Sequence, residues 1–109
     1  MNIELVVMEI ITNAGESKSE AMMALQHAKR HEWQACDAAL MRSKEAAGRA
    51  HAIQTQLIGL DEGEGKVPVT LVMVHAQDHL MNTILVKELL GYMMNMQNEI
   101  NQLKGMDQK

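Results

Sequence analysis

Two histidines and an aspartate lie close together in the segment His75-Ala76-Gln77-Asp78-His79. On a helical repeat His75, Asp78 and His79 are neighbours, because residues three and four positions apart lie on one side of a helix. The repeat that contains His75 and Asp78 is otherwise mostly apolar. Its members are Leu71, His75, Asp78, Asn82, Leu85, Leu89, Met93, Met96, Ile100 and Leu103. Burying an unpaired polar group costs about 1–3 kcal/mol, so stability alone does not explain these residues and we expect a functional site.

Three interpretations of this cluster are open. His75 can be a hydrogen-bonded core residue. His75 and His79 also have metal-ligand spacing, with Asp78 as a third ligand, although Ala76 stands where a hydrolytic zinc helix has its glutamate, which disfavours a metalloprotease. Finally, a neutral imidazole is a nucleophile near pH 7 and can hold a phosphoryl group covalently, while His79 can donate a hydrogen bond to it. Because no glycine-rich loop after a strand is present to bind a nucleotide, the phosphate would arrive on another protein.

Asp78 is an anion on a mostly apolar stripe, which is costly unless the charge is paired. In a symmetric oligomer its copies would converge near the axis and repel one another. A divalent cation reverses that balance, and Mg²⁺ favours an octahedral shell of carboxylate and water oxygens. The other interpretation is an Asp78 paired with a lysine or solvated.

The composition fits one globular domain over residues 1–109, with 47% hydrophobic and 22% charged residues. The net charge of −4 and the scattered Lys and Arg argue against nucleic-acid binding. No uninterrupted apolar run is long enough for direct membrane insertion, so we expect a cytoplasmic protein that reaches a membrane only through a partner.

The hydrophobic periodicity predicts helices over about residues 3–30, 32–60 and 69–104, with Pro68 in the first turn of the third. Short connections make neighbours antiparallel, so we expect an all-α, up-down-up three-helix bundle. Gly15 lies mid-helix, where glycine costs about 1 kcal/mol relative to alanine, and we expect a close approach of two helices there. The third helix has a second apolar stripe that can pack in its own bundle, which leaves the stripe of His75 as a seam against another subunit. This second stripe consists of Val72, Ala76, Leu80, Val86, Leu90 and Met94.

Residues 69–82, Val-Thr-Leu-Val-Met-Val-His-Ala-Gln-Asp-His-Leu-Met-Asn, resemble the signature of the lactose/cellobiose-type enzyme IIA of the bacterial phosphoenolpyruvate-dependent sugar phosphotransferase system. Residues 10–19 and 50–58 resemble other segments of that family. The resemblance implies a homotrimer of three-helix bundles. In it His75 is the phosphorylated residue, a transient phosphohistidine that receives its group from the phosphocarrier protein HPr and passes it to a cysteine of the cognate enzyme IIB.

The resemblance also implies that Asp78 lies at the trimer axis and binds a divalent cation, with Mg²⁺ the expected ion, and that His79 and Gln77 support the phosphoryl site. The Val-His-Ala-Gln form is nearer to cellobiose- or chitobiose-type members than to lactose-type ones, which indicates uptake of a β-disaccharide through a membrane enzyme IIC. Two rival functions remain without covalent chemistry. One is a helical metal-binding protein, and the other is a structural oligomerisation protein whose polar seam residues fix the register.

Overall fold

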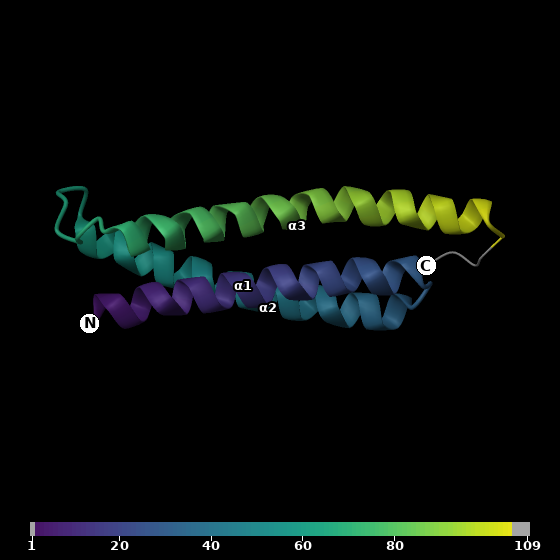
Figure 1. Ribbon diagram of the computed structural model, residues 1–109, viewed down its shortest axis with the longest axis horizontal. Coiled ribbons are helices and arrows are strands. Elements are labelled where there is room, and N and C mark those ends of the chain that lie inside the picture. Colours follow the sequence, from purple (N-terminus) through teal and green to yellow (C-terminus); the bar gives the residue numbers. More distant parts are fainter. Residues whose placement is uncertain (1, 106–109) are drawn as a thin grey trace.

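A computed structural model describes residues 2–105, which form three helices and no strand. They are α1 (Ile3–Lys29), α2 (Trp33–Asp61) and α3 (Leu71–Leu103). The prediction of an all-α fold with three helices is confirmed, and the helix ends differ from the predicted ones by at most two residues. The molecule is a rod with extents of 57 × 19 × 18 Å, because α3 runs nearly its whole length and α1 and α2 lie lengthwise alongside it (Figure 1).

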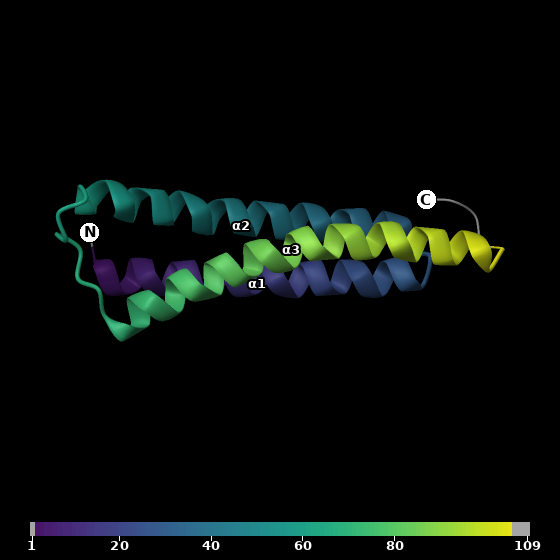
Figure 2. The same cartoon turned by 90° about the horizontal axis from the view of Figure 1, so that it is seen from above.

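The three helices run up, down and up. In Figures 1 and 2, α2 returns antiparallel to α1, and α3 runs in the same direction as α1. The turn after α1 is short, and His31 adopts a left-handed conformation in it with φ 61°. Helix α3 packs mainly on α1 and touches α2 much less. The site on α3 is therefore positioned chiefly by α1.

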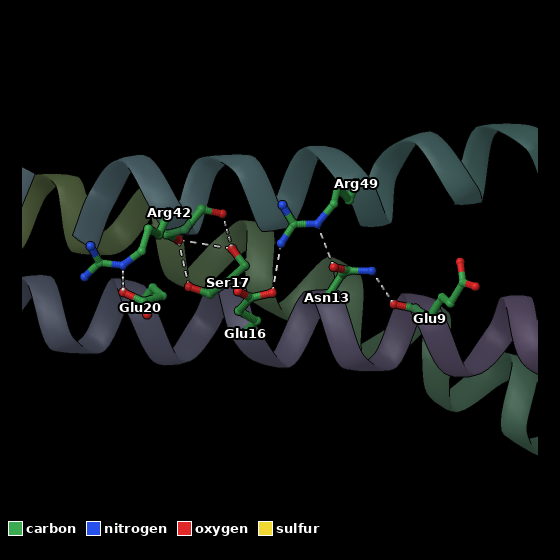
Figure 3. A network of polar contacts seen from close by, with 8 residues as sticks. Glu9, Asn13, Glu16, Ser17, Glu20, Arg42 and Arg49 are labelled. Carbon is green, nitrogen blue, oxygen red and sulfur yellow. Dashed lines mark hydrogen bonds and ion pairs between the residues drawn. The ribbon is translucent and has the colours of Figure 1, made fainter. Parts of the chain in front are cut away.

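Small polar side chains join α1 and α2 at the middle of the rod. The hydroxyls of Ser17 and Ser43 are both buried, and each donates to the other residue's backbone carbonyl, over 2.8 and 2.7 Å. Ion pairs reinforce the same interface at its edge, from Arg42 to Glu20 at 2.9 Å and from Arg49 to Glu16 at 2.8 Å (Figure 3). This interface fixes the rotation of α1, and hence the side that α1 presents to α3.

Hydrogen bonds also set the register of α3 on α1. The buried Thr83 hydroxyl donates to the Ala14 carbonyl over 3.2 Å, and the buried Asn101 side-chain amide donates to the Ala28 carbonyl over 3.1 Å. Apolar side chains of the second stripe fill the space between these two bonds. Within residues 2–105, every buried side-chain nitrogen and oxygen has a hydrogen-bond partner.

The second stripe of α3 lies in the chain's own core, as predicted. Ala76, Leu80, Leu90 and Met94 are buried and Val86 is half-buried; only Val72, at 40% exposure, departs from the pattern. None of the helices in residues 2–105 combines the length and the apolar character that crossing a membrane requires.

Candidate functional site

The start of α3 is fixed by hydrogen bonds from the preceding loop. The Thr70 hydroxyl accepts from the Met73 backbone N–H over 3.2 Å and caps the helix. The Asp61 carboxylate accepts from the backbone N–H groups of Val67 and Gly65, over 2.9 and 3.3 Å. Pro68 consequently lies in the loop before the cap, and the prediction that it occupies the first helical turn is wrong. His75 follows in the second turn of α3, on an anchored segment.

The structure brings His75 and His79 together. Their rings are parallel within 4°, with centroids 6.1 Å apart. His75 is exposed to solvent, whereas His79 is half-buried against α1. This arrangement leaves one imidazole open to a partner protein and holds the second imidazole beside it.

Gly15 of α1 provides the space for His79. A Cβ added at Gly15 would lie 3.5 Å from Nε2 of His79, which is the nearest atom outside α1. The expected close approach at Gly15 is therefore an approach of a side chain, and not of a second helix backbone. A side chain larger than alanine here would compete with the imidazole for the same volume.

Asp78 is exposed on the stripe that contains His75, and it forms no ion pair within residues 2–105. A single chain therefore leaves both carboxylate oxygens available for a ligand. Across the described part of the chain, no group of three or more His, Cys, Asp or Glu side chains is arranged to hold a metal ion. Any cation at Asp78 would thus need further oxygens from other copies or from water.

Gln77 is separated from His75 by the geometry of the helix. Its side chain is half-buried toward α2, where its Oε1 accepts a hydrogen bond from Nε2 of Gln54. Its amide also lies 3.9 Å from the sulfur of Met73. Within one chain Gln77 joins α3 to α2 and does not reach His75. Gln54 could not be assigned to this contact from the sequence, because no local pattern connects two residues on different helices.

The stripe of His75 and Asp78 is uncovered along the whole of α3. All of its members are exposed, from Leu71 at 87% through Leu89 at 47% to Leu103 at 88%. An apolar face of this extent is unusual on a monomeric protein and is typical of an interaction surface. His75 thus lies at one end of a face that no element within residues 2–105 packs against.

The sequence model described as PTS system, Lactose/Cellobiose specific IIA subunit matches residues 5–98. The chain belongs to this family. It is therefore a IIA phosphocarrier of the phosphotransferase system, and the family resemblance predicted from the sequence is confirmed.

Individual relatives are similar to this chain along nearly its whole length. The chain is 43% identical over 98 residues to the N,N'-diacetylchitobiose-specific EIIA component of Escherichia coli K12, covering 90% of this chain and 84% of the relative. Among solved structures, the cellobiose-specific enzyme IIA of Bacillus anthracis superimposes with a TM-score of 0.88 at 36% identity, covering 94% of each chain. The IIA(Chitobiose) of Escherichia coli, solved in complex with HPr, gives a TM-score of 0.80 at 40% identity, covering 93% of this chain and 98% of that one.

Proposed function

We propose that His75 is the residue of this IIA protein that carries the phosphoryl group. In the first step a ring nitrogen of His75 bonds to phosphorus as the bond to the donor histidine of phospho-HPr breaks. In the second step a cysteine thiolate of enzyme IIB bonds to phosphorus and the His75 imidazole leaves. One observation carries this assignment: His75 is an exposed imidazole on an anchored helix start, with a second imidazole stacked on it.

Phosphoryl transfer depends on positioning and on stabilisation of charge more than on covalent assistance. His79 fits a supporting role, because its ring is held parallel to that of His75 and packed against α1. The supporting role of Gln77 stays a prediction, since its side chain bonds to Gln54 on the other side of α3. HPr is proposed as the donor because a 40% identical IIA protein forms a complex with HPr.

Reconstitution tests the assignment directly. The chain is incubated with phosphoenolpyruvate, enzyme I and HPr, and its intact mass is measured. We expect the mass of one phosphoryl group to be added, to be lost in acid, and to be absent in His75→Gln. His51→Gln is the matched control, because His51 is also an exposed helical histidine but lies on α2. A wild-type chain that stays unmodified, or a His75→Gln chain that is modified normally, would overturn the proposal.

We further propose that three copies associate through the uncovered stripe of α3. The support is the exposure of its apolar side chains. Burying a fully exposed side chain of this kind contributes about 1.5–3 kcal/mol, and Leu89, at 47% exposure, would contribute roughly half of that. Leu89→Glu should therefore produce a monomer in sedimentation velocity. Met41→Glu is the control, because Met41 is similarly exposed, at 57%, but lies on α2. Equal masses for the two variants would contradict this assembly.

Asp78 would then bind a divalent cation at the axis of the trimer. The fit rests on its exposed, unpaired carboxylate in residues 2–105 and on the preference of Mg²⁺ for carboxylate and water oxygens. Three copies supply three carboxylates, and the cation would neutralise their mutual repulsion. Mg²⁺ should strengthen the association of the wild-type chain in sedimentation equilibrium, and EDTA should weaken it. Asp78→Asn should abolish both effects; an unaltered response in that variant would exclude Asp78 as the ligand.

The transported sugar is proposed to be a β-linked disaccharide of the chitobiose or cellobiose type. The support is the 43% identity to a chitobiose-specific relative. The sugar itself would be bound by the membrane enzyme IIC, and this cytoplasmic subunit would act only through IIB. Phosphorylated chain mixed with chitobiose-type and lactose-type IIB proteins should transfer its group faster to the former.

The two alternatives without covalent chemistry predict different outcomes in the same experiments. A metal-binding protein would retain a metal ion in elemental analysis and lose it on His79→Gln, with no added phosphoryl group. A structural oligomerisation protein would assemble through α3 without gaining mass and without responding to Mg²⁺. Family membership favours the phosphocarrier over both.

A further inference from the structure

An open hollow of about 530 Å³ lies between α1 and α3 beside His79. Its α1 wall includes Gly15, Lys18 and Ser19, and its α3 wall is His79 itself. The rest of its lining is Met22, Met23 and Gln26, farther along α1, and His75 is not part of it. His79, whose ring is parallel to that of His75 with centroids 6.1 Å apart, links the hollow to the proposed phosphoryl site. Lys18 is the cationic residue in this wall, and it is exposed to solvent.

A phosphoryl group brings nearly two negative charges to a histidine that has no cation beside it on its own helix. The next lysine or arginine on α3 is Lys87, which lies about 18 Å farther along at 1.5 Å per residue. Arg42 and Arg49 are already paired with glutamates of α1. Lys66 is paired with Glu62 in the loop before α3.

Lys18 is kept free of such pairing by the α1–α2 interface. Its nearest acidic neighbours in sequence, Glu16 and Glu20, both point toward α2 and pair with its arginines (Figure 3). The helical neighbours three and four positions away from Lys18 are uncharged. Within residues 2–105, Lys18 accordingly forms no ion pair.

The direction of α1 favours an approach of Lys18 to the site. The Cα–Cβ bonds of a helix tilt toward its N-terminus, so the side chain of Lys18 leans back toward the level of Gly15, where His79 packs. Because α1 and α3 run in the same direction, this is also the direction of His75 (Figure 1). A four-carbon side chain with a flexible ammonium can then reach across the hollow.

We propose that Lys18 is a phosphoryl-binding residue of this site, whose ammonium stabilises the negative charge of the phosphoryl group carried on His75. The inference depends on the proposed role of His75 and adds a second helix to the site. Because Lys18 is exposed and forms no ion pair in residues 2–105, we expect its substitution to leave the fold intact.

Lys18→Met tests the inference, with Lys18→Arg as the variant that keeps the charge. Lys44→Met is the matched control, since Lys44 is an exposed lysine on α2. Phosphorylation of His75 by phospho-HPr is followed by rapid quench and intact mass. We expect Lys18→Met to be roughly fivefold slower, the size of one charge interaction near a protein surface. The difference should shrink at high salt, and Lys18→Arg should restore most of the rate.

A second measurement separates charge stabilisation from a loss of structure. In a ³¹P NMR titration, the pKa of the phosphoryl group on His75 should rise in Lys18→Met, because a nearby cation favours the more charged form. It should stay unchanged in Lys44→Met. If the wild-type chain is phosphorylated but Lys18→Met matches Lys44→Met in rate and in pKa, the role of Lys18 is refuted. If the wild-type chain is never phosphorylated on His75, the proposed function itself fails.

Discussion

Enlarging Gly15 tests whether the position of His79 matters for chemistry at His75. An added Cβ would lie 3.5 Å from Nε2 of His79, an ordinary van der Waals distance. Gly15→Ala should therefore leave the imidazole in place. It should also raise the free energy of unfolding by roughly 0.5–1 kcal/mol, because alanine is the better residue inside a helix.

Gly15→Leu should have a different effect on the site. Its next carbon extends one further bond of about 1.5 Å from the Cβ position, and the branched end then occupies the hollow where His79 packs. The ring of His79 must move away from its parallel position beside His75. Since a misplacement of about 1 Å can cost up to 10²-fold in rate, we expect phosphorylation of His75 to slow roughly tenfold.

Gly48→Leu is the matched control, because nothing lies within 4 Å of a Cβ added at Gly48 in α2. Both leucine variants gain helix propensity, and circular dichroism checks that both are folded. The rate of phosphorylation by phospho-HPr is then compared by rapid quench. Equal rates for Gly15→Leu and Gly48→Leu would refute the view that His79 must stay where α1 holds it.

Two further predictions concern stability. Thr83→Val removes the buried hydrogen bond to the Ala14 carbonyl and should cost about 1 kcal/mol in urea unfolding at fixed protein concentration; a variant as stable as the wild type would show that this bond contributes nothing. Burial, and then the ammonium of Lys44, lower the pKa of Lys87 from its ordinary 10.5. The unfolded chain thus binds more protons in the alkaline range, and stability should rise as the pH approaches 10.5 from below. Lys87→Met should remove that contribution, so an identical pH dependence in both proteins would contradict it.

Hydrophobic periodicity was sufficient to predict the three helices and the inner side of α3. It worked because an amphipathic helix must bury its apolar stripe, and Leu80 and Leu90 lie on that stripe and are buried. The position of Pro68 was predicted wrongly for a local reason. The Thr70 hydroxyl caps α3, so the helix begins later than the first residue after the proline.

The sequence could predict which candidate site residues lie together only when those residues are on the same side of one helix. His75 and His79 are four residues apart, and their stacking follows from helix geometry. Gln77 is two residues from His75, and residues at that spacing do not face each other. The family signature groups all three residues, whereas the structure directs Gln77 to Gln54. Neither Gln54 nor Lys18 could be assigned from local sequence, because each depends on how a second helix is placed against α3.

The α3 stripe combines polar and apolar side chains, and a single chain leaves both kinds exposed. His75 and Asp78 are well solvated in the single chain, but they share a stripe with Leu85, Leu89 and other apolar side chains that are also exposed. Covering the apolar part with another copy would gain free energy, and the proposed contact would bring Asp78 and the edge of His75 toward the neighbouring chain. Assembly and phosphoryl chemistry should therefore be coupled. A Leu89→Glu monomer should accept phosphate on His75 more slowly than the wild type, although Leu89 lies about 21 Å away along the helix. A monomeric variant with an unchanged rate would show that each chain contains a complete site.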